Sequence, residues 1–582
     1  MSMWTDSANT ASSKDLEQSR LGWHALERWP VLRYYLWATM ILCWFVDALS
    51  TRQLSSPDAI SYLDIASACM KGQWGAAVNA YWSPAYPVLL SFWFSIFHPS
   101  VFTELLAAKC FNCLALIFAM FCFEYFLRGL LEYAQEAATN DRQGGPLPVW
   151  SLRTTGYTLF FWMSLYLIPP TLVTPDTLVL ASILFAAGII VRMAAGADSW
   201  SHFAALGIVL GFGYLAKAVM FPMALIFLAC SLFTIGNMRR TVPRVLLALL
   251  LFSLVSLPFV VLISRSKGRF TFGDTGGIAY AEYVNGVNFT IHWQGKPPGT
   301  GTPKHPTRKI LETPLVYEYA SPVAGTYPPW SDPSYWYDGV HPHFELRSQL
   351  NVLRHSFDSY FELSSQLGSF IAGFAALVLS QNRIRDSLKR FWSVGFLWIP
   401  ALAGLAMYAL ILVEARYIVG FLLLLWAGVF LAIRAPRNES GSAILRCVTL
   451  AAVLLLAFQI VWSVGHSVVR LASFRPPADL EVADELSHEG IVPGDKVAFV
   501  GFALMDHYWA FLAKVSIVAE VYHDDVESFW EARPEQKAQV LNLFAKSGAK
   551  AVIARDVPST RVADGWRQVA GTSYFILMLP NP

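Results

Sequence analysis

Charged residues are scarce in this sequence: only 14% of its 582 residues are Asp, Glu, Lys or Arg, whereas 55% are hydrophobic. A chain of this composition is too apolar for a soluble protein and predicts a membrane protein. The formal net charge of +2 is close to neutral, and no basic patch is interleaved with aromatic residues. The sequence therefore gives no indication of nucleic-acid binding.

The signatures of several enzyme classes are also missing. The sequence has no GxxxxGK[ST] loop, no GxSxG elbow and no HExxH pair, so nucleotide hydrolysis, serine hydrolysis and zinc-peptidase chemistry are not indicated. Six of the seven cysteines lie in or at the ends of apolar runs. No disulfide framework is indicated by this distribution.

Long apolar runs dominate what is present, and they predict a polytopic α-helical protein with about eleven membrane-spanning helices. The polar first thirty residues lead directly into the first run and predict a retained signal anchor behind a cytoplasmic tail over 1–33. Residues 86–97 are too few to cross a bilayer and predict a helix in the membrane plane. The eleven predicted spans are 34–50, 103–131, 153–170, 177–195, 203–216, 218–236, 245–264, 361–380, 392–413, 417–434 and 447–467.

The distribution of basic residues predicts which loops face outward. With 86–97 not crossing the membrane, every predicted cytoplasmic loop contains arginine or lysine or, in the case of 196–202, directly follows a span end with Arg192, as is usual for short cytoplasmic loops. The same assignment places the segments 51–102 and 265–360 and the C-terminal tail outside. We therefore predict one transmembrane domain over 34–470, with its polar chemistry gathered on the outer side.

Two outer segments differ in character. The segment 265–360 is rich in glycine, proline and aromatic residues and shows no sustained periodicity, which is typical of a functional loop rather than a disordered one. The segment 475–582 contains short β-like runs at 496–502, 515–521, 549–554 and 573–579, with a helical pattern over 526–547. This alternation predicts a small periplasmic α/β domain.

Two aspartates stand where predicted outer loops meet the membrane. Asp58 follows Pro57, so it either caps a surface helix or acts on a substrate that reaches the membrane surface. Asp176 follows Pro175 at the outer end of an apolar run. A carboxylate at such a position is costly and is a candidate functional group, although Asp176 also suits a simple helix start.

Two cations lie at the same predicted level. Lys217 separates two apolar runs, and its side chain either reaches the interface for solvation or binds a phosphate. Glu414 and Arg416 lie at the outer junction of two late runs, where they either compensate each other or let Arg416 bind a phosphate. His292 and Trp293 in the outer loop supply further polar and aromatic side chains but show no metal-binding spacing.

In layout over about residues 30–435, the sequence resembles the GT-C class of integral-membrane glycosyltransferases. The likeness is to the branch with lipid A aminoarabinose transferase and the protein O-mannosyltransferases. The features that carry it share one order and one side of the membrane: Asp58 with Tyr62, the run Ser83-Pro84-Ala85-Tyr86-Pro87, Asp176, Lys217 and Glu414-Ala415-Arg416-Tyr417.

The resemblance implies an inverting glycosyltransferase in a bacterial inner membrane. Its donor would be a polyprenyl-phosphate sugar, and its acceptor a glycan, lipid or protein on the periplasmic side. Asp58 would be the general base, with Asp64 as a rival. Lys217 and Arg416 would bind the donor phosphate, and Asp176 would orient the acceptor or help to hold a divalent metal ion. The resemblance places Tyr62, Asp64, Trp82, Tyr86, His292, Trp293 and Glu414 in the substrate pocket.

Other functions are compatible with the same residues. A transporter or flippase of a lipid-linked sugar would use the carboxylates and cations along a translocation path, but it predicts polar residues at several depths of the spans. In this sequence they gather at the predicted outer edge. A non-catalytic membrane scaffold would use the outer loop and the tail for partner binding, and it predicts that Asp58 and Lys217 are dispensable.

Overall fold

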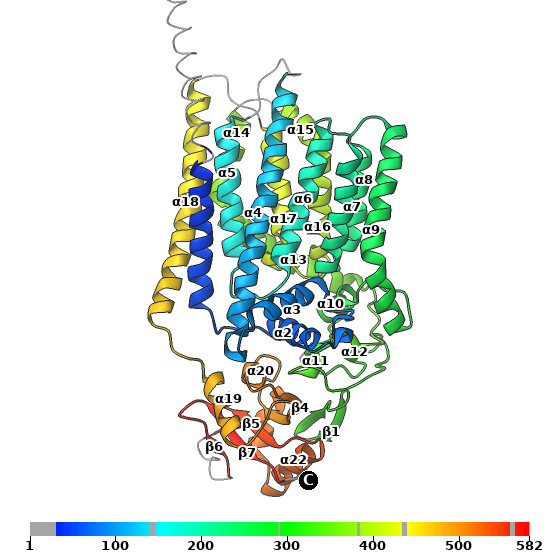
Figure 1. The fold of residues 1–582 in the computed structure, drawn as a ribbon, viewed down its shortest axis with the longest axis vertical. Coiled ribbons are helices and arrows are strands. Elements are labelled where there is room, and N and C mark those ends of the chain that lie inside the picture. The colour runs from blue at the N-terminus through cyan, green and yellow to red at the C-terminus, as the bar shows by residue number, and fades with distance from the viewer. Residues whose placement is uncertain are drawn as a thin grey trace, which may run out of the picture.

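A bundle of long helices carries a smaller mixed α/β region at one end (Figure 1). The computed structural model describes residue 29 and the ranges 31–139, 147–288, 292–380, 384–433, 439–558 and 565–580. Most of the predicted cytoplasmic tail over 1–33 lies outside these residues. The bundle consists of Val31–Ser50, α4 (Val101–Thr139), α5 (Val149–Trp162), α6 (Asp176–Ala194), α7 (Trp200–Ala216), α8 (Met220–Leu232), α9 (Met238–Lys267), α13 (Leu346–Gln366), α14 (Gly368–Ser380), α15 (Ile384–Ser393), α16 (Gly395–Ala409), α17 (Ala415–Ala432) and α18 (Glu439–Ala472).

Six of the described helices are long and apolar enough to cross a membrane, or seven if one bent pair counts as a single span. The six are Val31–Ser50 and the helices α4, α6, α9, α17 and α18, and the bent pair joins α15 to α16 at 79°. The predicted count of eleven is therefore not confirmed. Not every predicted run forms one long helix. The run 153–170 passes from α5 into a π-helical turn, Met163–Leu167, and the runs on the two sides of the predicted break at Lys217 form only the short helices α7 and α8.

Two short helices lie across the end of the bundle that faces the α/β region (Figure 1). They are α2 (Pro57–Met70), followed by a 3₁₀ turn at Trp74–Ala77, and α3 (Ala85–Phe97). Ser56 caps α2, since its hydroxyl accepts the Ala59 N–H at 3.2 Å, and Pro57 occupies the first turn, where it sacrifices no intrahelical bond. Asp58 is therefore not the capping residue, and its carboxylate is available for other contacts.

The outer segment 265–360 is largely structured. It contains α10 (Thr275–Tyr283), β1 (Arg308–Glu312), β2 (Leu315–Glu318), α11 (Pro328–Ser331), α12 (Pro333–Trp336) and the start of α13. The β1–β2 hairpin joins the sheet of the C-terminal region, because β2 pairs antiparallel with β4. The outer segment and the C-terminal region thus share one sheet.

That sheet is mixed and has seven strands in the order β1-β2-β4-β3-β5-β7-β6. β4, β3 and β5 are parallel, and their nearly continuous burial explains their largely apolar sequences. The C-terminal elements are α19 (Ala478–His488), β3 (Lys496–Val500), α20 (Tyr508–Leu512), β4 (Ser516–Val521), a 3₁₀ turn at His523–Asp525, α21 (Val526–Glu531), α22 (Pro534–Lys546), β5 (Ala551–Arg555), β6 (Arg567–Gln568) and β7 (Tyr574–Met578).

Candidate active site

Asp58 lies in the first turn of α2, with both carboxylate oxygens engaged. Oδ2 accepts a hydrogen bond from Arg416 Nη2 at 3.1 Å, and Oδ1 accepts one from the indole N–H of Trp330 at 3.3 Å. Its side chain remains 23% exposed. The contact with Arg416 joins residues 358 positions apart. Asp58 is thus held at the junction of α2, α17 and the outer segment, where a ligand from outside can still reach it.

Asp176 is more deeply buried and contacts both cations. As the first residue of α6, it is 3% exposed. Its Oδ1 accepts a hydrogen bond from Lys217 Nζ at 2.6 Å, and its Oδ2 accepts one from the Thr174 hydroxyl at 2.8 Å. Arg416 Nη1 lies 3.8 Å from the same Oδ2. Buried charges of this kind are tolerated when they are paired and hydrogen-bonded, as Asp176 is.

Lys217 and Arg416 converge on one tyrosine ring. Lys217 has extended backbone between α7 and α8, and its Nζ lies 3.4 Å from the centre of the Tyr417 ring. Arg416 Nη2 donates to the Tyr417 hydroxyl at 3.1 Å, and Tyr408 stacks on Tyr417 at 5.2 Å. The ring faces fix the two cations in position by cation–π attraction and packing.

We call Asp58, Asp176, Lys217 and Arg416 the outer charge cluster. The four residues come from α2, α6, the α7–α8 junction and α17, and Arg416 contacts both carboxylates. An anion that enters the cluster could bind both cations, and Asp58 would then lose its ionic partner. The arrangement can therefore combine an anion-binding pair with a carboxylate that accepts a proton.

The predicted aromatic residues pack beside Asp58. Tyr62 is one turn further along α2, and its ring contacts Trp82 at 5.0 Å and Tyr86 at 5.1 Å, both edge to face. Trp82 donates its indole N–H to the Trp330 carbonyl at 3.0 Å. Burial, with the charges of Asp58 and Asp176, raises the pKa of Tyr62 well above its usual value. The phenol of Tyr62 therefore stays protonated at neutral pH.

Asp64 has a different set of partners. Its Oδ2 accepts the backbone N–H of Thr326 at 2.6 Å, and its Oδ1 accepts the Thr326 hydroxyl at 3.0 Å. Burial raises the pKa of Asp64 to about 6, although the Thr326 N–H opposes this shift. The carboxylate of Asp64 thus fixes the outer segment against α2, while that of Asp58 faces the cations.

Three predicted pocket residues are not brought to the charge cluster. His292 Nε2 lies 2.6 Å from Glu520 Oε1 in the interior of the shared sheet region. Trp293 stacks on Tyr337 and donates to the Thr300 hydroxyl at 3.3 Å. Glu414 is exposed at the start of α17, and no side-chain hydrogen bond or ion pair engages it among the described residues.

The carboxylates of the cluster do not suit a divalent metal ion. Such ions need several oxygen ligands, whereas Asp58 and Asp176 already accept contacts from Lys217, Arg416 or uncharged donors. Across the residues that the structure describes, no group of three or more His, Cys, Asp and Glu side chains could hold a metal. The donor set does not fit a resident divalent ion.

Three residues of the site received no role from the sequence, although one of them, Tyr417, belongs to the motif Glu414-Ala415-Arg416-Tyr417. Tyr417 and Thr174 are adjacent or nearly adjacent to predicted site residues, so their proximity to Arg416 and Asp176 was available as a signal. Trp330 offered none, because it lies 272 positions from Asp58 in a segment without periodicity. Its place beside Asp58 depends on the outer segment folding back over α2.

No known protein-family profile matches the chain, and no curated protein matches it by sequence. Two solved structures of ArnT from Cupriavidus metallidurans share its fold. The apo state aligns over 95% of this chain and 98% of its own, with 13% identity and a TM-score of 0.52. The structure bound to undecaprenyl phosphate aligns over 94% and 97%, with 13% identity and a TM-score of 0.51. The GT-C-like fold that the sequence resemblance implies is confirmed.

Proposed function

We propose that this protein is an inverting integral-membrane glycosyltransferase that moves a sugar from a polyprenyl-phosphate donor to an acceptor. The observation that carries the proposal is the outer charge cluster, in which Arg416 lies between the carboxylates of Asp58 and Asp176 and Lys217 contacts Asp176. The solved relative in fold that is bound to undecaprenyl phosphate adds support, because a polyprenyl phosphate carries the anion that Lys217 and Arg416 suit.

The donor phosphate would bind Lys217 and Arg416. Its negative charge competes with Asp58 for Arg416, so donor binding frees Asp58 Oδ2. Asp176 is buried against both cations and is a positioning residue that keeps them on the phosphate. Cations fixed in a site that excludes water stabilise the charge that develops on a leaving phosphate, and this term is commonly the largest in such catalysis.

Asp58 would then act as the general base. The acceptor hydroxyl oxygen attacks the anomeric carbon from the face opposite the phosphate, and Asp58 takes the hydroxyl proton. The bond from the anomeric carbon to the phosphate oxygen breaks, and polyprenyl phosphate leaves with the electron pair. The configuration at the anomeric carbon is inverted. Trp330, which donates to Oδ1, would hold the carboxylate in place during the transfer.

The reaction would take place on the outer side of a bacterial inner membrane. The charge cluster lies at the ends of α6 and α17 and beside α2, at the end of the bundle that carries the sheet (Figure 1). Arginine and lysine in the predicted cytoplasmic loops favour an outward orientation for this end. A donor carried by the membrane reaches the site without any nucleotide-binding domain.

The test is sugar transfer by purified full-length protein from a panel of radiolabelled polyprenyl-phosphate sugars into a membrane extract. Wild type is compared with Asp58→Asn and Asp64→Asn. Transfer that is lost with Asp58→Asn and retained with Asp64→Asn supports the proposal. The opposite pattern assigns the base to Asp64. No transfer from any donor overturns the proposal in favour of transport of a lipid-linked sugar.

A further inference from the structure

A further pocket, lined by charged and apolar side chains, lies in the outer segment, and the proposed transfer step does not use it. Its cavity volume is about 390 Å³. Pockets for small ligands commonly have about 300–1,000 Å³. It is lined by the residues 269–274, Gly277, Ile278, Lys304 and 337–342. We call it the loop pocket.

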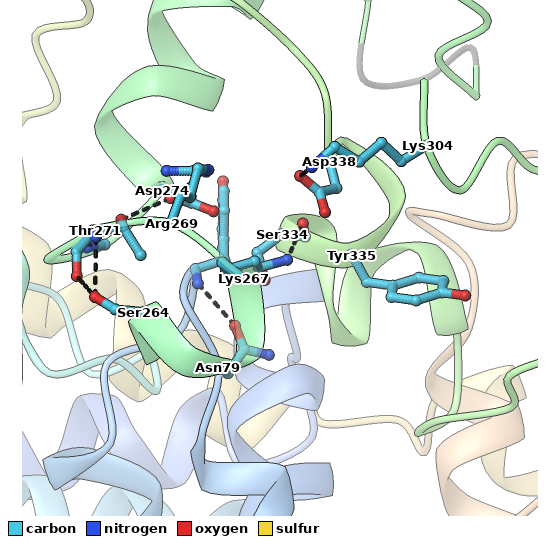
Figure 2. Close-up of polar contacts among 12 residues, drawn as sticks. Asn79, Ser264, Lys267, Arg269, Thr271, Asp274, Lys304, Ser334, Tyr335 and Asp338 are labelled. Atoms are coloured by element: carbon cyan, nitrogen blue, oxygen red, sulfur yellow. Dashed lines mark hydrogen bonds and ion pairs between the residues drawn. The ribbon is translucent and has the colours of Figure 1, made fainter. Parts of the chain in front are cut away.

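Two ion pairs lie on opposite sides of the loop pocket (Figure 2). Arg269 Nη2 lies 2.8 Å from Asp274 Oδ1, and Lys304 Nζ lies 3.4 Å from Asp338 Oδ1. Between them, Lys267 donates to the Ser334 carbonyl. Both carboxylates are buried, whereas the side chains of Arg269 and Lys304 are about half exposed.

The charges of these pairs indicate the kind of ligand. Each lining cation already has its own carboxylate, so a phosphate that binds Arg269 or Lys304 would meet the negative charge of Asp274 or Asp338 beside it. A neutral polyhydroxylated ligand meets no such repulsion, because its hydroxyl groups can donate to the carboxylates and accept from the cations. The rings of Phe272, Tyr337 and His341 supply apolar surface to the same pocket. Together these groups suit a neutral saccharide.

One side of the loop pocket is held together by backbone contacts. The His341 N–H bonds to the Thr300 carbonyl at 2.8 Å, and the Lys304 N–H bonds to the Asp338 carbonyl at 2.9 Å. The two backbone segments approach so closely that a Cβ on Gly339 would lie 2.0 Å from the Thr302 carbonyl oxygen. A preformed polar pocket binds at a lower entropic cost than one that must be ordered.

The loop pocket adjoins the outer charge cluster. Its wall residue Gly273 has φ +140°, and a Cβ there would lie 2.9 Å from the Cβ of Ala218, the neighbour of Lys217. Asp274 donates its backbone N–H to the Ala80 carbonyl at 2.7 Å, and the Thr275 hydroxyl donates to the Tyr81 carbonyl. The segment 271–275 therefore separates the loop pocket from the segments that carry Lys217 and Trp82.

We propose that the loop pocket binds a neutral saccharide portion of the acceptor, while the hydroxyl to be glycosylated reaches Asp58. This inference rests on the proposed function, because it assigns the acceptor of that reaction to the class of glycans. Arg269, Asp274, Lys304 and Asp338 would select the acceptor by hydrogen bonds to its hydroxyl groups. A site built in this way discriminates strongly against ligands that lack those hydroxyls.

Direct binding tests the inference without any donor. Saturation-transfer NMR of the full-length protein in nanodiscs would use a panel of neutral di- to tetrasaccharides. We expect wild type to bind members of the panel, and Asp338→Asn and Arg269→Gln to weaken that binding about tenfold or more, as the loss of one charged hydrogen bond would. Lys309→Gln, which alters an exposed ion pair on β1, is the matched control and should bind like wild type.

Three results would overturn the inference: no saccharide of the panel binds, binding is unchanged in both pocket variants, or inorganic phosphate displaces the bound saccharide. The last result would assign the loop pocket to an anionic group. Asp58→Asn separates this inference from the proposed function, because it should lose sugar transfer and keep saccharide binding. Failure of transfer with every donor would leave the binding measurement valid.

Discussion

The outer charge cluster and the loop pocket each contain two aspartates, a lysine and an arginine, but their ion pairs are arranged differently. In the cluster, Arg416 lies between two carboxylates, and Asp176 contacts both cations. In the loop pocket, Arg269 pairs with Asp274 and Lys304 with Asp338 as separate pairs. A shared network can exchange partners when an anion enters, whereas separate pairs remain balanced. Neighbouring sites can therefore serve a charged donor and a neutral acceptor.

The largest effect should come from Asp58. We expect Asp58→Asn to lower the transfer rate about 10²–10⁴-fold, because the amide cannot accept the proton of the acceptor hydroxyl. Initial rates at saturating donor and acceptor would measure this loss. Glu312→Gln is a matched carboxylate-to-amide control, since Glu312 is exposed on β1. A rate within about twofold of wild type in Asp58→Asn would show that Asp58 is not the base.

The next largest effect should be on the stability of the fold, and it distinguishes the outer charge cluster from the loop pocket. We expect Lys217→Met to lower the free energy of unfolding by about 3–5 kcal/mol, because it leaves the buried Asp176 carboxylate without its nearest cation. Lys304→Met should cost about 0–1 kcal/mol, because Lys304 is 54% exposed and its pair with Asp338 is screened by solvent. Denaturant titration in detergent would compare the two variants. Equal losses of unfolding free energy in the two variants would contradict this difference between the outer charge cluster and the loop pocket.

Parts of this arrangement could be predicted from the sequence. Asp58, Asp176, Lys217 and Arg416 were recognisable because a charge at the end of an apolar run is costly and therefore conspicuous. The strands β3, β4, β5 and β7 were recognisable because buried strands have largely apolar sequences.

Other parts depend on contacts between distant residues. The hairpin β1–β2 pairs with β4, about two hundred positions later in the chain, and its own sequence carries no strong alternation. The loop pocket combines residues from 269 to 342 that share no spacing pattern. The predicted number of spans is not confirmed, because some predicted runs form helices shorter than a full span, such as α7 and α8.

A buried carboxyl outside the outer charge cluster and the loop pocket should make the stability of the protein depend on pH. Glu282 on α10 has no hydrogen-bond partner for Oε1, and burial raises its pKa from 4.5 to about 8. The folded protein therefore binds a proton that the unfolded chain releases between these values, so stability falls as the pH rises from about 4.5 to about 8. We expect Glu282→Gln to remove this fall and to unfold at a higher temperature than wild type above pH 8.

Thermal unfolding of both proteins in one detergent, measured from pH 5 to pH 9, would test this expectation. The two unfolding temperatures should converge at the acid end, where Glu282 is protonated in the native protein. Parallel pH profiles would show that Glu282 ionises normally. Glu345→Gln is a suitable control, because Glu345 is exposed and its removal should leave the pH profile of wild type unchanged.

The smallest effect on transfer should come from Asp64, six residues after Asp58 on the same helix. Its carboxylate accepts two hydrogen bonds from Thr326, and an amide offers only one acceptor, so Asp64→Asn should loosen this contact by about 1–3 kcal/mol. Hydrogen exchange over residues 320–330 should accelerate, while transfer at saturating substrate should fall less than about tenfold. A loss as large as that of Asp58→Asn would instead mean that the charge cluster only positions the donor and that the proton is taken at Asp64.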